Sequence, residues 1–166
     1  DYMFKDALGN ERQLATIQID FAMPKRFGLE YVDENGEKQT PVMLHRAILG
    51  SYERFLAILL EHFNGSLPAW LQPLQAAILP ISEDQSEYAE NILSELSEKL
   101  PDLRTDIYPA QESLGKRIRE AQNQRIPYIL IAGGSEQKNN TVNVRLRTEE
   151  ELGEVSIDQF IARAHD

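Results

Sequence analysis

The second half of this chain alternates predicted strands with predicted helices, and this order constrains the fold more than any other feature. Short apolar runs between turn residues predict strands, and longer segments with apolar residues three and four positions apart predict helices. The predicted elements are a strand over 75–81, a helix over 83–100, a strand over 103–108, a helix over 113–125, and strands over 128–132 and 141–146. Ser156 and Gln159 form a capping box that begins a last helix, ending at His165. Right-handed crossovers between such strands give a small α/β domain with a largely parallel or mixed sheet.

The first part of the chain has a different pattern, which predicts antiparallel strands followed by one helix. The predicted elements are a strand from Arg12 to Met23 that ends at Pro24, a hairpin of 29–32 with 40–45 around Asn35-Gly36, and a helix from Ser51 to Phe63 that stops at Asn64-Gly65. The apolar side of this helix is expected to be buried and carries Tyr52, Phe55, Leu56, Leu59, Leu60 and Phe63. The fold class is therefore α+β in the first part and α/β in the second.

Two prolines and the single tryptophan lie between these patterns, in S-L-P-A-W-L-Q-P from Ser66 to Pro73. This composition is typical of a short, semi-rigid connection. We therefore predict a first domain over 1–65, a linker over 66–73 and a second domain over 74–166.

Composition narrows the class of protein. Among the 166 residues there is no cysteine, which excludes disulfides and thiolate metal sites and fits a reducing, cytoplasmic compartment. No apolar run is long enough for a membrane span, and the first residues, D-Y-M-F-K-D, do not resemble a signal peptide. Because these residues include no initiator methionine at position 1, we expect the chain to begin inside a longer protein.

Charge is unevenly distributed along the chain. The net charge of −10 disfavours indiscriminate nucleic-acid binding, because the mean field repels phosphates. Between Ser113 and Arg147, however, seven basic residues face only Glu120 and Glu136. The basic residues are Lys116, Arg117, Arg119, Arg125, Lys138, Arg145 and Arg147. A confined basic face on an acidic protein favours one specific anionic partner.

The segment H-R-A-I-L-G-S-Y-E-R-F, from His45 to Phe55, combines a strand histidine with an arginine in the first turn of a helix. Arg54 opposes the positive end of the helix dipole, a mismatch of about 0.3–1 kcal/mol. This placement makes sense if an anion binds between Arg54 and the free backbone N–H groups. The alternative is a solvated arginine on an ordinary amphipathic helix.

Polar residues of the first predicted strand offer a second candidate surface. Thr16, Gln18 and Asp20 alternate along one face, and with Gln13 they could line the floor of a polar pocket or a solvated sheet face. His45 is either a hydrogen-bonded structural histidine or a metal ligand, and in the second case further ligands must come from outside its segment. The sequence contains no nucleophile elbow, P-loop or dinucleotide-binding fingerprint, and Gly133-Gly134 more simply turns the chain.

The helix predicted over 113–125 has two different faces. Leu114, Ile118 and Ala121 form the inward seam, whereas a second face is open to solvent or a ligand and carries Lys116, Arg119 and Asn123. Tyr108 and Tyr128 could stack on unpaired bases or, alternatively, lie in the core with a solvated hydroxyl.

Several motifs resemble threonyl-tRNA synthetases, a family of class II aminoacyl-tRNA synthetases. R-Q-L-A-T-I-Q-I-D-F and P-V-M-L-H-R-A-I-L-G-S-Y-E-R-F resemble the end of the catalytic domain, including its third motif. L-P-I-S-E-D-Q-S-E-Y-A, L-G-K-R-I-R-E-A, R-I-P-Y-I-L-I-A-G and V-N-V-R-L-R resemble the anticodon-binding domain of that family. The resemblance covers nearly the whole chain.

The resemblance implies a role for each matching position. Arg54 corresponds to the arginine that grips the ATP phosphates, Gln13 and Thr16 lie near the adenylate, and Gln18 helps to hold threonine. His45 corresponds to a zinc ligand whose partners lie far upstream in the family. The positions that match anticodon-reading residues are Arg119, Glu136 and Arg145, and Gln111 replaces an asparagine that is frequent in the family.

The implied function is a threonine–tRNA ligase that uses ATP with Mg²⁺ and zinc, acts on threonine and tRNA, and forms a homodimer in its full-length form. The first two class II motifs, the other zinc ligands and an editing domain are missing from these 166 residues, so we expect the chain alone to be inactive. Gly134-Ser135 also departs from the family pattern before Glu136. Two alternatives remain: a non-catalytic tRNA-binding module, and a relative that charges another amino acid.

Overall fold

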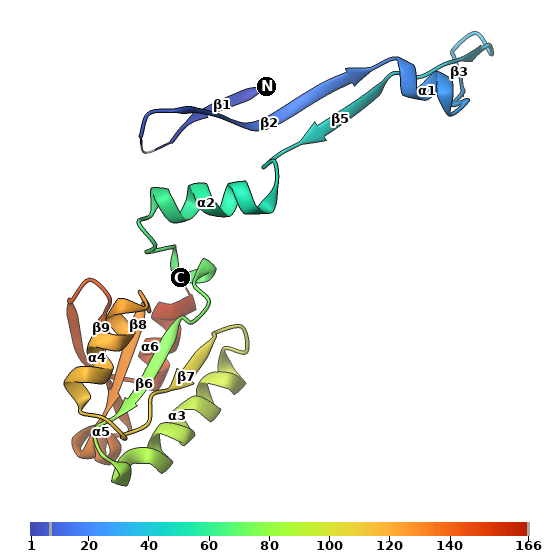
Figure 1. Cartoon of the computed structure of the whole chain (residues 1–166). Coiled ribbons are helices and arrows are strands. Elements are labelled where there is room, and N and C mark those ends of the chain that lie inside the picture. Colours follow the sequence, from blue (N-terminus) through green and yellow to red (C-terminus); the bar gives the residue numbers. More distant parts are fainter. Residues whose placement is uncertain (7, 166) are drawn as a thin grey trace. The chain divides into compact units, whose positions relative to one another are not determined.

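The computed structural model describes residues 1–6 and 8–165 and divides into two compact units, Asp1–Gly65 and Ser66–Asp166 (Figure 1). Each unit has its own sheet. The assignment of 66–73 as a linker between two domains stays a prediction.

The first unit is built on a three-stranded sheet in the order β1-β2-β5. Its strands are β1 (Tyr2–Lys5), β2 (Glu11–Asp20) and β5 (Met43–Ala47), and both neighbouring pairs are antiparallel. The predicted antiparallel architecture is confirmed. In the β2–β5 register, Gln18 lies opposite His45 and Asp20 opposite Met43, so the polar face of β2 meets the histidine of β5.

Two details of the predicted strands are wrong. β2 ends at Asp20, and Pro24 lies inside the short helix α1 (Ala22–Arg26), whose N-terminal Ala22 and Met23 N–H groups bond the Asp20 side chain. The Asn35-Gly36 hairpin joins only β3 (Tyr31–Val32) and β4 (Lys38–Gln39). The following strand, β5, is not part of this hairpin. It pairs with β2 over a longer stretch than β3 pairs with β4.

Helix α2 (Tyr52–His62) begins at Ser51, whose hydroxyl oxygen accepts the Arg54 N–H, as the sequence predicts. Asn64 and Gly65 have positive φ, and the Gly65 N–H bonds the Leu60 carbonyl, which closes the helix with a left-handed turn. The expected burial of the apolar side is wrong for this chain. No α2 residue is buried, and Tyr52 is 91% exposed. A periodic pattern identifies the apolar face of a helix, but it does not show whether another part of the chain covers that face.

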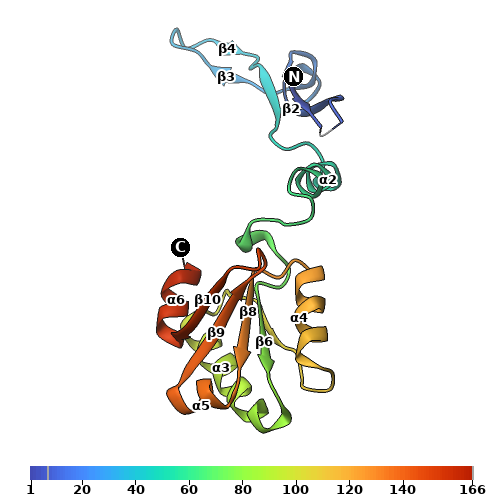
Figure 2. The same cartoon turned by 90° about the vertical axis from the view of Figure 1, so that its left-hand side faces the viewer.

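The second unit has a five-stranded mixed sheet in the order β10-β9-β8-β6-β7 (Figure 2). Its strands are β6 (Ala76–Pro80), β7 (Thr105–Ile107), β8 (Tyr128–Ala132), β9 (Thr141–Leu146) and β10 (Glu151–Ser156). β6 is parallel to β7 and β8, whereas β9 is antiparallel to β8 and β10. The mixed sheet is confirmed, and β10 is an edge strand that the sequence did not predict.

Helices cover the two faces of this sheet unequally. The helical elements are η1 (Ala69–Leu71), η2 (Glu83–Gln85), α3 (Ser86–Lys99), α4 (Leu114–Asn123), α5 (Gly134–Asn139) and α6 (Ile157–His165). α3 and α6 pack on one face around Ile92, Val142 and Phe160, while α4 packs on the other face around Ala121 and Ile129. β9 contributes no buried residue to the α4 side, so this half of the face is left to polar side chains. No helix in the described ranges is long and apolar enough to cross a membrane.

Two arginines of the second unit hold the segment that precedes β6. Arg104 donates four hydrogen bonds of 2.7–3.1 Å to the carbonyl oxygens of Trp70, Gln72 and Pro73. Arg147 Nη1 donates to the Leu67 carbonyl at 2.7 Å. These bonds attach the segment that was predicted to be a semi-rigid connection to the second unit.

Candidate functional site

In the first unit, Arg54 extends from the first turn of α2 to the edge of β2. Its backbone N–H is capped by Ser51 at 3.3 Å, and its Nη1 lies 3.4 Å from the Gln13 carbonyl oxygen. The guanidinium group stays exposed and is engaged by only this one long hydrogen bond within the described ranges. Arg54 can therefore reorient toward an anion at small energetic cost.

Gln13 and Thr16, the two other positions expected near ATP, converge on one carboxylate oxygen. Gln13 Nε2 donates to Asp1 Oδ1 at 2.9 Å, and Thr16 Oγ1 donates to the same atom at 2.5 Å. Their side chains thus lie within reach of one small polar group. Such a pair of donors can hold the polar edge of a ligand in place of the carboxylate.

His45 and Asp20 form a carboxylate–histidine pair on the β2–β5 surface. His45 Nε2 lies 3.0 Å from Asp20 Oδ2, while Asp20 Oδ1 accepts the N–H groups of Ala22 and Met23 at 2.8 and 3.0 Å. The Met23 N–H, followed by the His45 ring and the Ala22 N–H, holds the pKa of Asp20 below its usual range. Asp20 was expected only as part of a polar strand face, and the structure gives it the further role of orienting the histidine.

Gln18, Asp20 and His45 line one shallow hollow at the end of the sheet, together with Ile19, Phe21 and Ala22. Metal-binding histidines ordinarily give their second ring nitrogen to a carboxylate or carbonyl, as His45 does to Asp20. No group of three or more metal-ligating side chains occurs among the residues that the structure describes. His45 therefore fits one ligand of a zinc site whose remaining ligands would come from elsewhere.

In the second unit, Arg119 and Arg145 flank the part of the sheet that α4 leaves uncovered. One flank of α4 faces β7, since Tyr108 Oη donates to Gln124 Oε1 at 2.8 Å, and Arg119 projects, exposed, from the other flank. Arg145 lies on β9 opposite Ile129, on the α4 side of the sheet. Its Nη1 is 3.6 Å from Glu151 Oε1, and its buried Nε has no hydrogen-bond partner in the described part of the chain.

Glu136, the third residue expected to read the anticodon, lies on α5 at the carboxyl end of β8. Its Oε2 accepts the Gly133 N–H at 3.1 Å, so the carboxylate caps its own helix. The sequence predicted a simple turn at Gly133-Gly134 and missed this six-residue helix, although a glutamate three residues after an N-cap position is a helix-start signal. No hydrogen bond or ion pair joins Arg119, Glu136 and Arg145 to one another among the described residues.

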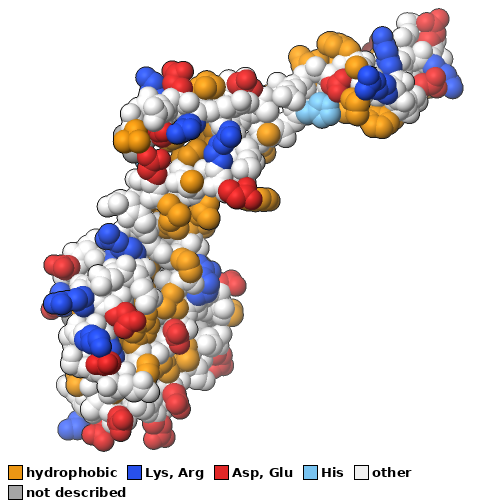
Figure 3. Space-filling model, in the orientation of Figure 1, with side chains coloured by type: hydrophobic (Ala, Val, Ile, Leu, Met, Phe, Trp, Pro, Cys, Tyr) orange, Lys and Arg blue, Asp and Glu red, His pale blue; other side chains and the backbone are white. Residues whose placement is uncertain are grey.

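The expected basic face is smaller than the sequence suggested. Arg117 is only 3% exposed and donates to the carbonyl oxygens of Pro80, Tyr108, Glu112 and Ile81. Burial lowers the pKa of its guanidinium group. Lys116 pairs with Glu112 at 2.9 Å, and Arg147 holds Leu67 as described above. In Figure 3, Lys and Arg side chains in the region of α4 are interspersed with Asp and Glu side chains.

Tyr108 and Tyr128 belong to the core of the second unit. Tyr108 packs against the α4-side cluster, and burial, followed by the charges of Glu120 and Asp106, raises its pKa. Tyr128 packs edge-on against Phe160 with ring centroids 5.4 Å apart. Of the two readings left open by the sequence, the structure supports core tyrosines. The seam of Leu114, Ile118 and Ala121 on α4 is also confirmed.

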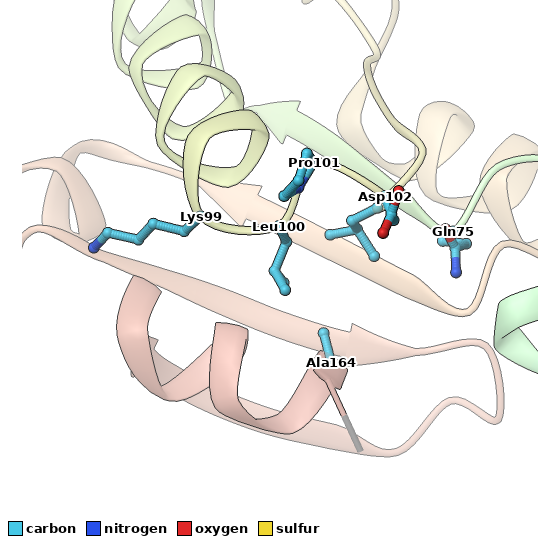
Figure 4. Close-up of a pocket in the computed structure, with 7 residues that line it drawn as sticks. Gln75, Lys99, Leu100, Pro101, Asp102 and Ala164 are labelled. Carbon is cyan, nitrogen blue, oxygen red and sulfur yellow. The ribbon is translucent and has the colours of Figure 1, made fainter.

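A pocket of about 280 Å³ lies at the amino ends of β6 and β7, where the end of α3 meets the end of α6 (Figure 4). Its basic side chain, Lys99, points away from Asp102 and Gln75 and pairs with Glu95 and Asp158, each at 2.7 Å. These two carboxylates raise the pKa of Lys99. The lysine thus has its partners already, and Asp102 is the other charged side chain among the lining residues.

Two family models of known proteins match different parts of the chain. Residues 75–165 match the anticodon binding domain family, which is more than half of the chain. The chain belongs to this family. Residues 1–63 match the core domain of class II tRNA synthetases of the group for G, H, P, S and T.

Two similar relatives are a threonine–tRNA ligase and a threonine–tRNA ligase catalytic subunit. The chain is 48% identical over 163 residues to a threonine–tRNA ligase of Caldanaerobacter subterraneus, with 98% of this chain and 25% of that protein covered. It is 48% identical over 161 residues to a threonine–tRNA ligase catalytic subunit of Sulfurisphaera tokodaii, covering 97% of this chain and 29% of that protein. The resemblance to threonyl-tRNA synthetases is therefore confirmed, and the chain spans about a quarter of the length of these relatives.

The fold is similar to a solved structure described as the RNA binding domain of threonyl-tRNA synthetase from Cryptosporidium parvum. The TM-score is 0.87 with 39% sequence identity, and the match covers 98% of this chain and 41% of the other. The predicted fold class, with antiparallel sheets followed by a mixed α/β sheet, is thus confirmed.

Proposed function

We propose that this chain is the C-terminal part of a threonine–tRNA ligase and that its second unit binds tRNA at the anticodon. The observation that carries the proposal is the order of two matches in one chain, a class II synthetase core over 1–63 followed by an anticodon binding domain over 75–165. Relatives 48% identical to nearly all of the chain are threonine–tRNA ligases, which favours threonine over other amino acids.

In the proposed reaction, threonine is activated by ATP and then transferred to tRNA. Arg54 would bind the phosphates of ATP, with Mg²⁺ as the counter-ion, and stabilise the negative charge that develops as pyrophosphate leaves. This electrostatic role requires no proton transfer, and it suits a guanidinium held by only one long bond to the Gln13 carbonyl. Gln13 and Thr16 would hold the adenylate through the donors that now bond Asp1.

The hollow around Gln18 and His45 would select threonine. Zinc bound there would supply Lewis acidity toward the polar groups of the substrate. His45 would hold the metal through the ring nitrogen that Asp20 does not engage, and Asp20 would fix the orientation of the ring. Gln18, opposite His45 in the register, would hold the substrate beside it. Polar recognition separates threonine from valine far better than an apolar pocket could.

In the second unit, Arg119 and Arg145 would supply positive charge and hydrogen-bond donors to the unpaired anticodon, and Glu136 would accept from the amino groups of its bases. The unpartnered Nε of Arg145 supports this assignment, because a buried donor without an acceptor is costly unless a ligand satisfies it. The full-length protein is proposed to act as a homodimer.

Filter binding of the 166-residue chain to a threonine tRNA transcript tests the proposal. We expect binding that weakens as salt rises, and no ATP–pyrophosphate exchange by the chain alone. Arg119→Ala should weaken binding about tenfold with little change in melting temperature. Arg163→Ala is the matched control, since Arg163 is exposed on α6 against the opposite face of the sheet. Equal losses in both variants would contradict the assigned surface, and measurable exchange would contradict the expected inactivity.

A further inference from the structure

Tyr88 lies on α3, on the face of the sheet opposite the proposed RNA surface, and its hydroxyl reaches out of the core. The residue is 6% exposed and its ring packs in the cluster that contains Ile92 and Val142. Its oxygen lies 2.7 Å from the Thr141 carbonyl oxygen and 3.3 Å from the Glu136 carbonyl oxygen. One buried phenol therefore contacts both α5 and the first residue of β9.

The segment that Tyr88 holds has little other anchoring. None of the α5 residues is buried, so apolar packing does not fix this helix. The Gly133 N–H bonds the Glu136 carboxylate at its start, and Asn140 ends it with a left-handed φ of 55°. Thr141 Oγ1 donates to Glu154 Oε1 at 2.5 Å, and Asn139 Nδ2, at the end of α5, donates to the same oxygen at 2.9 Å. The position of α5 thus depends on a few polar contacts, and Tyr88 connects it to the core.

We propose that Tyr88 is a positioning residue for anticodon recognition: its hydroxyl fixes the backbone of α5 so that Glu136 can meet a base. The inference rests on the proposed function of the second unit. Tyr88 is too deeply buried to touch RNA, so its influence passes through the Glu136 backbone. Burial, then the negative charges of Glu136, Glu95 and Glu154, raise the pKa of Tyr88, so the hydroxyl remains a donor at neutral pH.

Amide hydrogen exchange in the 166-residue chain tests the structural half of the inference without RNA. Tyr88→Phe removes one oxygen and keeps the ring in the core. We expect the Gln137 and Gly133 amides, which bond within α5, to exchange about tenfold faster, with no change in β6 or β8. Tyr128→Phe, which removes a hydroxyl from another tyrosine packed against the same cluster, should leave amide exchange in α5 unchanged. Unchanged exchange in α5, or an equal rise throughout the unit, would overturn the inference.

Binding measurements test the recognition half. The discrimination of the chain is the dissociation constant for a threonine tRNA transcript with one anticodon base replaced, divided by the dissociation constant for the unchanged transcript. Tyr88→Phe should lower this ratio about fivefold, Glu136→Gln should lower it at least as much, and the double variant should fall no further than Glu136→Gln alone. Additive losses, or an unchanged ratio in Tyr88→Phe, would overturn the recognition role. A wild-type chain without discrimination would overturn the proposed function and this role together, while the exchange result would still decide whether Tyr88 holds α5.

Discussion

Replacing Arg117 by methionine should destabilise the second unit substantially, although the change removes a buried charge. The guanidinium is 3% exposed and donates to the carbonyl oxygens of Pro80 at 2.7 Å, Tyr108 and Glu112 at 3.0 Å, and Ile81 at 3.3 Å. Through these four acceptors, Arg117 connects the carboxyl ends of β6 and β7 to the loop before α4. Methionine fills much of the volume and offers no donor.

The expected magnitude follows from two opposing effects. Each buried carbonyl left without a donor costs about 1–3 kcal/mol, and the Pro80 acceptor is the most buried of the four. Removing the buried charge offsets part of this destabilisation. Among the described residues Arg117 has no carboxylate partner, so its desolvation is not compensated by an ion pair. We expect a net loss of about 3 kcal/mol in the free energy of unfolding.

Urea unfolding followed by Trp70 fluorescence measures this loss, since the only tryptophan lies in the same unit. With a slope of about 2 kcal/mol per molar urea, the midpoint should fall by about 1.5 M. Arg117→Lys, which keeps the charge and fewer donors, should fall between the wild type and the methionine variant. A methionine variant that unfolds within about 0.3 M of the wild type would refute the reasoning. In that case the free-energy penalty of burying the guanidinium charge would equal the stabilisation that its hydrogen bonds provide.

Two further predictions concern α5 and the histidine pair. Gly133→Ala would place a Cβ 2.6 Å from both Glu136 Oε2 and Ile81 Cδ1, so we expect a loss of about 1–3 kcal/mol by thermal unfolding, whereas Gly134→Ala, with no atom within 4 Å of its Cβ, serves as the control. Equal melting temperatures for the two variants would contradict the packing at Gly133. The pKa of Asp20 is lowered in the folded state, so its carboxylate should make the wild type more stable to unfolding than Asp20→Asn. This difference in the free energy of unfolding should be complete above pH 3.8, the ordinary pKa, and should disappear as the pH falls through the lowered pKa. Denaturation of both proteins between neutral and acidic pH measures this, and an advantage independent of pH would contradict the role of the carboxylate.

Elements whose signals are local were predictable from the sequence. The strands over 128–132 and 141–146 agree with β8 and β9 because each apolar run is bounded by turn residues. The helix cap at Ser51 and the capping box of Ser156 and Gln159 are also present. In each case the interacting groups lie within a few residues, so the spacing itself specifies the geometry.

Elements that depend on distant partners were not predictable. α5 buries no residue and has no apolar period, so the spacing of Glu136 from the N-cap was its only local signal, and β10 contains Gly153 at a positive φ beside an irregular register. Arg117 was counted as part of a basic surface because its carbonyl acceptors lie on other elements. The pairing of β5 with β2 likewise follows from tertiary structure.

The candidate site shows the same division. Spacing singled out Arg54 and His45, but only the structure joins His45 to Asp20 and Arg54 to the Gln13 carbonyl. Spacing placed Gln18 on a polar strand face and Arg145 in a basic segment, but the specific roles of Gln18, Glu136 and Arg145 came from the resemblance.

The most direct test of the account is the affinity of the 166-residue chain for two tRNA transcripts that differ only in the anticodon. The account predicts that a threonine tRNA binds roughly tenfold tighter than the same molecule with a replaced anticodon base, because sequence-specific RNA recognition reads unpaired bases. Equal affinity for both transcripts, at every salt concentration, would contradict the claim that the second unit reads the anticodon.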